Sequence, residues 1–550
     1  MSKYTIGIDY GTLSGRAVVV DVTTGEELAA AVMEYPHGVM ETALPDGTPL
    51  PPQWALQHPQ DYLDVLYAIV PQALAASGIS PQDVIGIGVD FTACTVLPVR
   101  ADGMPLCLEE KYAGRPHAWV KLWKHHGAQV QADRITALGA ECPGLLAGFG
   151  GKASCEWMFP KLMELLEQDP ALAADADRII EAGDWLVWLL CGNEVRSMCL
   201  AGYKALWSAE TGYPAPEILG KMHPQLPQLV AEKMTAPMLP ITGCAGGLTD
   251  SMAAALGLLP GTPVAAANID AHSAIPACGV SRPHDMVMIM GTSSCHHVMS
   301  AGQHAIPGLF GIVKDGVLPG YYAYEAGQSC CGDHFDWAVK NIAPESYAQE
   351  ARSRGISLHQ LMQEKCAGRR PGENGLLALD WYNGNRSILN DSRLTGMILG
   401  LTLSTRPEDI YRALVEATAY GTRTIIEAIE AGGVPVQGLF ACGGLAQKSP
   451  MLMQIYADVT GREIRIAASR QASALGAAIH AAVAAGSERG GYDSAAEAGA
   501  HMARLLDTVY RPIAENRAVY DRLYAEYRTL HDYFGRGEND VMKRLMALRG

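Results

Sequence analysis

Apolar and polar positions at the start of the chain predict a β-hairpin. Residues 4–10 and 16–21 are two mostly apolar runs, and the glycine-containing segment 11–15 separates them. Short apolar runs joined by a small-residue turn are typical of paired antiparallel strands. The first run carries Asp9 near its end, so a carboxylate is expected beside the turn.

A similar pattern returns near the middle of the chain. Residues 286–290 are apolar, Gly291-Thr292 follow, and apolar positions resume after them. This predicts a second strand-Gly-Thr-strand hairpin, and the repeat indicates two lobes of related design whose hairpin tips face a shared cleft. We place the lobe boundary near residue 280, which gives an N-terminal lobe of 1–280 and a C-terminal lobe of 281–550.

The rest of the pattern predicts an α/β chain. Strand-like runs alternate with segments of helical periodicity, which is typical of sheets covered by helices. The expected elements are a helix over 59–76, a strand over 84–89 that ends at Asp90, a helix-rich middle that covers the first lobe, a strand-like run over 264–270, a helix over 407–432, a strand over 438–441 with a Gly-Gly turn into a helix near 451, and helical cover with an exposed tail from 495 on.

Length and composition fit a compact folded chain with two large lobes. The 550 residues exceed what one core usually holds, and the chain is 49% hydrophobic and 18% charged. The 42 Lys and Arg against 58 Asp and Glu give a net charge of −16. Without a basic run, this acidic balance argues against nucleic acid and anionic membrane surfaces as partners, because both are polyanions.

Cysteine usage and the apolar tracts indicate a cytoplasmic protein. Thirteen scattered cysteines without a CxxC pair fit a reducing compartment. Cys295-His296-His297 contains metal-ligand residue types, but neighbours in a strand face opposite sides and do not converge on one ion. Asp9 interrupts the first apolar stretch and no cleavage pattern follows, so no secretory signal is predicted. Residues 473–486 fall short of the about 20 apolar residues that span a bilayer.

The two hairpins carry the candidate chemistry. Small residues at a hairpin tip let backbone N–H groups approach phosphate oxygens, and Thr or Ser hydroxyls add donors. Asp9 is placed to bind Mg²⁺ directly or through water. Each feature has a plain alternative, an ordinary turn for each tip and a turn-capping carboxylate for Asp9. Two tips together with the Gly443-Gly444 turn, which lets an adenine or ribose lie against backbone, favour nucleotide binding.

Six ordered motifs resemble the sugar-kinase family that includes glycerol kinase and xylulokinase. They are GIDYGT (7–12), EWMFPK (156–161), AGYKA (201–205), NIDAH (268–272), YEAGQ (324–328) and CGGLAQK (442–448), and a second family signature runs from 396 to 416. The resemblance covers nearly the whole chain and implies two actin-like, ribonuclease H-like lobes with a nucleotide and sugar cleft between them. It implies ATP and Mg²⁺ as cofactors and a small sugar as partner, with L-ribulose phosphorylated to L-ribulose 5-phosphate in L-arabinose catabolism.

The resemblance also assigns roles to particular positions. It implies Asp270 as the catalytic base that takes the proton of the sugar hydroxyl. The implied sugar contacts are Ala93, Trp123, Lys204, Asp270 and Glu325, and the implied nucleotide contacts are Thr12, Arg16, Thr292, Gly332, Gly443, Gly444 and Lys448. Several relatives carry Asn where Lys448 stands, which leaves the adenine contacts open.

Four of these residues also have a plain structural interpretation. Without the family, Trp123 fits a core position, Lys204 a solvated helix residue and Glu325 a surface charge at a strand end. Arg16 fits an ion pair with an acidic neighbour.

Asp250 competes with Asp270 for the role of base. Residues 245–250 look like the Gly-rich segment that carries the base in xylulokinases. In relatives the base precedes the Thr of the second hairpin by an interval close to the 22 residues between Asp270 and Thr292, whereas Asp250 lies 42 residues before that Thr. The spacing favours Asp270, and Asp250 is then expected as a helix N-cap.

Two other functions stay open from the sequence. A xylulokinase or another pentulose or polyol kinase would share the fold and the phosphate motifs, since these do not select the sugar. An actin-like ATPase acting as a chaperone would also bind nucleotide, but Asp270 and Glu325 and the lack of an evident peptide-binding β-domain argue against it. Closure of the lobes on the sugar is expected to exclude water. The oligomeric state stays open, a homo-oligomer included.

Overall fold

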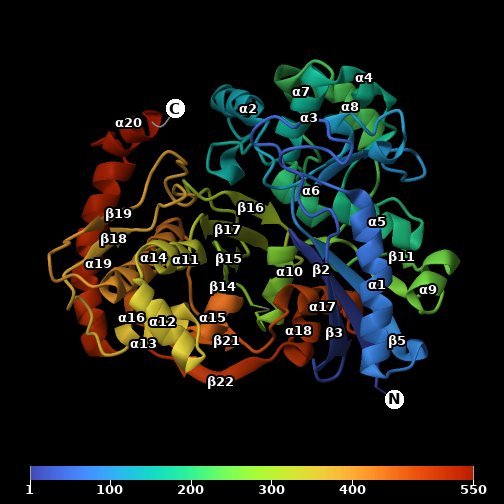
Figure 1. Cartoon of the computed structure of the whole chain (residues 1–550). Helices are drawn as coiled ribbons and strands as arrows, with labels where there is room; N and C mark the ends of the chain where they lie inside the picture. The colour runs from blue at the N-terminus through green and yellow to red at the C-terminus, as the bar shows by residue number, and fades with distance from the viewer. Residues whose placement is uncertain (1, 281, 549–550) are drawn as a thin grey trace.

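The structure is a computed structural model that describes residues 2–280 and 282–548. Two mixed β-sheets lie side by side, each flanked by helices, and smaller assemblies extend beyond them (Figure 1). The first sheet has the strand order β11-β12-β5-β1-β2-β3, with β13 also paired to β5. Its strands are β1 (Tyr4–Tyr10), β2 (Ser14–Asp21), β3 (Glu27–Glu34), β5 (Val84–Phe91), β11 (Cys244–Gly247), β12 (Pro263–Ala265) and β13 (Asn268–Ile269).

The second sheet repeats this plan with the order β16-β17-β15-β14-β20-β21-β22. Its strands are β14 (Met286–Met290), β15 (Ser294–Ser300), β16 (Gly311–Lys314), β17 (Tyr322–Gln328), β20 (Leu439–Cys442), β21 (Ile464–Ala467) and β22 (Leu505–Tyr510). In both sheets an antiparallel hairpin has a third antiparallel strand on one side and two parallel strands on the other, followed by an antiparallel edge strand. The prediction of an α/β chain with two related lobes is confirmed.

A helix from the second half of the sequence completes the first sheet. Helix α17 (Ala472–Ala485) packs on β1 and β5 at glycine positions. A Cβ added to Gly7 would lie 1.7 Å from the Ala474 carbonyl oxygen, and one on Gly88 would lie 1.9 Å from that of Ala477. Only glycine lets the helix backbone come this close. The lobe boundary near 280 stays a prediction, and it borders residue 281, which is outside the described residues.

Helix α10 (Asp270–Ala277) lies between the two sheets, packed along α17 and touching both β5 and β14 (Figure 1). It begins immediately after β13, so its first residue sits at the carboxyl edge of the first sheet. The strand-like run predicted over 264–270 is therefore two short strands and a helix start. Helix α1 (Pro59–Ser77) packs on β2 and β3, and α5 (Ala182–Cys191) packs on β5 and β12.

The helix-rich middle forms a cap with a hydrophobic core of its own, seen at the top right of Figure 1. A small sheet of order β4-β7-β6-β8 supports it. Its elements are β4 (Leu56–Gln57), β6 (Val96–Val99), β7 (Val120–Lys121), β8 (Arg178–Glu181), α2 (Gln129–Glu141), α3 (Met158–Gln168), α4 (Pro170–Asp175), α7 (Pro216–Met222) and α8 (Leu226–Lys233), while β9 (Arg196–Ser197), β10 (Met238–Leu239), α6 (Met198–Lys204) and α9 (Asp250–Leu256) complete this half.

Helices also surround the second sheet, and one strand there differs from the prediction. The helices are α11 (Gly332–Asn341), α12 (Glu345–Arg354), α13 (Leu358–Cys366), α14 (Pro407–Ala431), α15 (Gly444–Lys448), α16 (Pro450–Thr460), α19 (Ala514–Gly535) and α20 (Val541–Ala547), beside the ribbon β18 (Leu377–Leu379) and β19 (Met397–Leu399). Helix α18 (Ala495–Met502) instead packs on α17 and α10 beside the first sheet. Helical cover was expected throughout from 495, yet β22 is an edge strand paired with β21. Its Thr508-Val509-Tyr510 end is rich in strand-forming residues, and the pairing partner is distant in sequence. Among the described residues, no helix has both the length and the apolar character needed to cross a bilayer.

Candidate active site

Three carboxylates meet at the carboxyl edge of the first sheet. Asp9 on β1 pairs in register with Asp90 on the parallel strand β5, and β13 pairs Asn268 with the same Asp90 just before Asp270. Asp9 is 7% exposed and Asp90 is fully buried. Ligands of open α/β sheets bind at this edge, because the strand ends and the following turns leave a crevice there.

Burial and mutual repulsion change the protonation of this group. Burial, followed by the charge of Asp9, raises the pKa of Asp270 to about 7. Burial and the charges of Asp9 and Asp270 raise the pKa of Asp90 well above its usual value. Burial also raises the pKa of Asp9, although Arg16 opposes this effect. The three carboxylates therefore form a site that favours either protons or a cation.

Asp90 was not among the predicted site residues. Neither of its carboxylate oxygens has a hydrogen-bond partner among the described residues. A buried carboxylate without partners is costly, so it indicates a functional position. The available signal was an aspartate directly after a buried apolar strand, the same pattern that singled out Asp9.

Lys204, Glu325 and His272 come together where α6, α10 and β17 meet. Lys204 ends α6, and its Nζ lies 3.7 Å from Oε2 of Glu325 on β17. His272 Nε2, from α10, lies 3.4 Å from the same oxygen. That oxygen makes no hydrogen bond among the described residues. Burial acts to raise the pKa of Glu325, but Lys204 and His272 outweigh it, so the pKa falls well below its usual value and the side chain is anionic.

These contacts decide between the alternatives for the two charged residues. Lys204 is 9% exposed and Glu325 5% exposed, so neither is a solvated surface charge. The Tyr203 hydroxyl donates to the Ala323 carbonyl at 3.1 Å and ties α6 to β17 beside them. The pair joins the two lobes across the cleft.

Trp123 and Ala93 lie on the cap side of the cleft. Trp123 follows β7, is half-buried, and its Nε1 donates to Thr12 Oγ1 at 3.0 Å. A residue predicted to contact sugar thus touches one predicted to contact phosphate. Ala93 is half-buried in the turn after β5, where its carbonyl accepts a hydrogen bond from Thr95 Oγ1 at 3.3 Å.

The first hairpin tip is held by side chains that sequence reasoning did not find. Gln57 Nε2 donates to the Thr12 carbonyl at 2.8 Å, and the Tyr35 hydroxyl donates to the Gly11 carbonyl at 2.9 Å. The Tyr62 hydroxyl in turn donates to Gln57 Oε1 at 2.6 Å. These bonds fix backbone carbonyls of the tip, and the Gly11 N–H donates to the Ser14 carbonyl at 3.0 Å.

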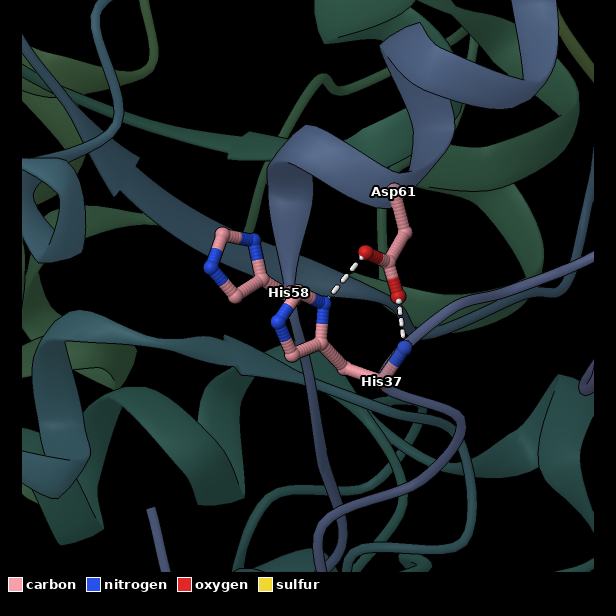
Figure 2. A group of neighbouring side chains, drawn as sticks. All are labelled: His37, His58 and Asp61. Carbon is pink, nitrogen blue, oxygen red and sulfur yellow. Dashed lines mark hydrogen bonds and ion pairs between the residues drawn. The ribbon is translucent and has the colours of Figure 1, made fainter. Parts of the chain in front are cut away.

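Figure 2 shows His37, His58 and Asp61, a group with the residue types of a metal site. His37 Nδ1 lies 2.6 Å from Asp61 Oδ1, and the backbone N–H of His37 donates to Asp61 Oδ2 at 3.0 Å. His58 is the N-cap of α1, and its Nδ1 accepts from the Gln60 N–H at 3.2 Å. These bonds use Nδ1 of each imidazole and fix the start of α1, while Nε2 of each ring takes no part in them.

Arg16 lies next to the carboxylates. Its Nε lies 3.2 Å from Asp9 Oδ2, and its Nη1 donates to Gln471 Oε1 at 2.9 Å, just before α17. The ion pair with an acidic neighbour, which was the plain structural interpretation of Arg16, is therefore present.

The second hairpin tip packs against two glycine turns. The Gly332 N–H donates to the Gly291 carbonyl at 3.0 Å, and the Cys331 N–H donates to the Thr292 carbonyl at 2.7 Å. Gly443 has a φ of 92°, and a Cβ there would lie 2.5 Å from the Met290 carbonyl oxygen. Glycine is thus required where β20 turns into α15.

The two turns leave room near the hairpin. Thr292 and Gly444 are exposed, and a Cβ on Gly444 would meet nothing within 4 Å. Lys448 is exposed at the end of α15.

Asp250 stands apart from these residues, whereas the Cys-His-His run lies on β15, where His297 pairs in register with Glu325. Asp250 is exposed at the start of α9, after the edge strand β11. The prediction that Asp250 is the N-cap of this helix is wrong. Thr249 is the cap, and its hydroxyl accepts from the Met252 N–H at 3.3 Å. His296 and His297 point to opposite sides of β15, toward Thr422 on α14 and His272 on α10 respectively.

Comparison with known proteins agrees with this geometry. Residues 4–276 match the N-terminal domain, and residues 286–485 the C-terminal domain, of the FGGY family of carbohydrate kinases. The chain is 53% identical over 539 residues to a ribulokinase of Bacillus licheniformis, covering 98% of each chain. It is 54% identical over 551 residues to a ribulokinase of Shouchella clausii, covering all of this chain and 98% of that one.

Solved structures share the fold. A xylulose kinase from Rhodospirillum rubrum superposes with a TM-score of 0.78 at 25% identity, covering 96% of this chain and 98% of that one. The Plasmodium falciparum glycerol kinase with ADP superposes with a TM-score of 0.75 at 17% identity, over 96% and 98% of the two chains. The chain belongs to the FGGY family of carbohydrate kinases.

Proposed function

We propose that this chain transfers the γ-phosphoryl group of ATP to the terminal hydroxyl of L-ribulose and forms L-ribulose 5-phosphate. The observation that carries the proposal is the position of Asp270, between the carboxylates of the first sheet and the Lys204–Glu325 pair. Several relatives named ribulokinase are 52–54% identical over nearly the full length, whereas the xylulose kinase is 25% identical. This difference favours L-ribulose over other pentuloses.

Asp270 is the proposed general base. Its carboxylate takes the proton of the terminal hydroxyl as the sugar oxygen bonds to the γ-phosphorus and the bond to ADP breaks. A base with a pKa of about 7 is well matched to this proton transfer near neutral pH. Glu325, with one unpartnered oxygen, is suited to accept hydrogen bonds from sugar hydroxyls, and Lys204 to donate them.

The nucleotide is proposed to lie between the two hairpin tips. Thr12 and Thr292 offer hydroxyl donors to the phosphates, and Arg16 offers charge beside them. Gly332 and Gly443 are proposed to line the phosphate and adenosine site by letting their turns pack against the second hairpin, and Gly444 leaves room for the nucleotide near Lys448.

The carboxylate group fits a Mg²⁺ ion. Asp9 is the proposed ligand, direct or through water, and the unpartnered oxygens of Asp90 face the same group. The pKa values of all three aspartates are raised, so a hard cation bound among them would reduce the repulsion between their carboxylates. When bound, the ion neutralises phosphate charge.

We propose a cytoplasmic location because the thirteen thiols fit a reducing compartment.

Product analysis tests the proposal. Purified protein with ATP and Mg²⁺ is given L-ribulose, D-xylulose, a pentitol or an unfolded peptide in turn, and ADP and the phosphorylated sugar are measured. The highest kcat/KM is expected with L-ribulose, and ATP hydrolysis without sugar is expected to be slow. Faster turnover with D-xylulose would make the chain a xylulokinase, and stimulation by the peptide alone would favour the chaperone function.

A further inference from the structure

Arg386 lies on the wall of the proposed active site beside Phe310. It is half-buried, and within the described ranges its guanidinium is found over the ring of Phe310, 5.3 Å from the centroid, and in no ion pair. The Lys204 ammonium lies 5.5 Å from the centroid of the same ring. Two cations therefore share one aromatic side chain at the sugar end of the cleft.

The neighbour of Arg386 in sequence fixes it to β17. The Ser387 N–H donates to the Gly327 carbonyl at 3.1 Å, and the Gly327 N–H donates to Ser387 Oγ at 3.1 Å. A Cβ on Gly327 would lie 3.4 Å from Cδ of Arg386, so the arginine covers this glycine. The side chain is thus anchored to the sheet.

This anchoring places Arg386 between the sugar residues and the second hairpin tip. Side chains two positions apart point to the same face of a strand, so Gly327 shares the face of Glu325. The register pairs Gln328, one residue further, with Ser294 beside the tip. Along β17 the order is therefore the sugar carboxylate, Arg386, and then the phosphate hairpin.

We propose that Arg386 is a further catalytic residue, whose guanidinium binds oxygens of the γ-phosphoryl group as it passes from ATP to the sugar. The inference rests on the proposed function. A guanidinium matches phosphate oxygens in a planar, two-pronged geometry and keeps its charge at any working pH. Positive charge is what phosphoryl transfer requires at this point, since the transferred oxygens carry the negative charge.

A competing use of Arg386 is an ion pair with Glu156 on the cap. Burial acts to raise the pKa of Glu156, but a hydrogen bond from His126 and the charge of Arg386 outweigh it and lower the pKa. Closure of the cap would bring this pair nearer. The experiment therefore includes Glu156.

The test compares Arg386→Gln, Arg386→Lys, Glu156→Gln and the double variant Glu156→Gln/Arg386→Gln with the control Arg370→Gln, whose side chain is 89% exposed and whose guanidinium lies 3.7 Å from Glu373. We expect Arg386→Gln to lower kcat about 10²–10³-fold. Melting temperature and the Kd values for L-ribulose and ADP should stay near wild type. Arg386→Lys should recover part of kcat because it keeps the charge, and Arg370→Gln should keep all of it.

Three outcomes would overturn the inference. A kcat of Arg386→Gln within threefold of wild type would exclude a catalytic role while leaving the proposed function intact. Equal losses in Glu156→Gln, Arg386→Gln and the double variant would show that the guanidinium acts only through Glu156. A wild-type chain that phosphorylates no pentulose would defeat the proposed function and this inference together.

Discussion

Trp123 donates its indole N–H to the hydroxyl oxygen of Thr12 at 3.0 Å. Because this bond uses a lone pair of the oxygen, the hydroxyl proton of Thr12 stays free to donate elsewhere. The cap residue proposed to contact sugar therefore also sets the donor direction at the first phosphate tip. The proposed sugar and nucleotide sites are therefore linked through one hydrogen bond.

Removing this bond should weaken ATP use. Trp123→Phe keeps a ring but loses a hydrogen bond of about 1 kcal/mol, so the KM for ATP should rise roughly fivefold. Trp119→Phe is the matched control, since Trp119 Nε1 donates to the Ala113 carbonyl within the cap. It should lower the melting temperature and leave this KM unchanged. Equal KM values for ATP in Trp123→Phe and wild type would contradict the link.

The choice between two candidate bases can be tested directly. Asp270→Asn should lower kcat about 10²–10⁴-fold, because the amide cannot accept the hydroxyl proton. Binding of L-ribulose, followed by calorimetry, should persist. Asp250→Asn should keep wild-type kcat, since Asp250 is exposed at the start of α9. A larger loss in Asp250→Asn than in Asp270→Asn would reverse the assignment.

Activity and stability should respond to pH in opposite directions. A base must be ionised, so kcat/KM should rise as pH increases through about 7, the pKa of Asp270 in the folded protein. The same raised pKa means that the folded state binds more protons than the unfolded chain from about pH 4 to 7. The free energy of unfolding should therefore fall as the pH rises through this range.

Asp270→Asn removes that loss of stability. In protein free of metal and nucleotide, thermal melts at pH 8 should show the variant more stable by roughly 3–4 kcal/mol, and melts at pH 4 should show no difference. A variant less stable at pH 8 than wild type would contradict the raised pKa.

Two buried aspartates should respond differently to truncation. Asp90 has no hydrogen-bond partner among the described residues, whereas Asp184 Oδ1 accepts from the Ser197 N–H at 2.9 Å. Without metal, Asp90→Ala should leave stability equal or higher, while Asp184→Ala should cost about 1–3 kcal/mol by orphaning that N–H. In the presence of Mg²⁺, only Asp90→Ala should lower kcat, by roughly tenfold or more. Unfolding in urea and steady-state rates measure both, and the reverse ranking would argue against a cation site at Asp90.

Close packing of α17 on the first sheet predicts a steric effect. Gly88→Ala places a Cβ 1.9 Å from a backbone oxygen of α17, which cannot rotate away. The free energy of unfolding should fall by about 3 kcal/mol. Gly368→Ala is the control, because a Cβ there meets nothing within 4 Å. Similar values for the two variants would mean that the helix shifts without cost.

Local pattern predicted the hairpins and several helix bounds well. The strand 4–10 is β1, 286–290 is β14, and the helix expected over 407–432 is α14, because each is defined by nearby apolar spacing, prolines and glycines. The grouping of Lys204 with Glu325 followed from motif resemblance and is present as an ion pair.

Long-range pairing explains what the sequence did not predict. Strand β22 depends on its neighbour β21, and the partners of Gly11 and Thr12 are side chains tens of residues away. Asp90 can be identified as a candidate site residue only once the pairing of β5 with β1 places it beside Asp9. Such relations are set by tertiary contacts, which override local preference.

The position of α17 on the first sheet bears on how the chain is made. A ribosome releases β1 and β5 more than 380 residues before it completes Ala472–Ala485. Until then, α17 cannot cover the glycine-lined face of the nascent sheet, and an uncovered sheet face favours aggregation and chaperone binding. Folding of the N-terminal half is therefore a late event, completed only near the end of synthesis.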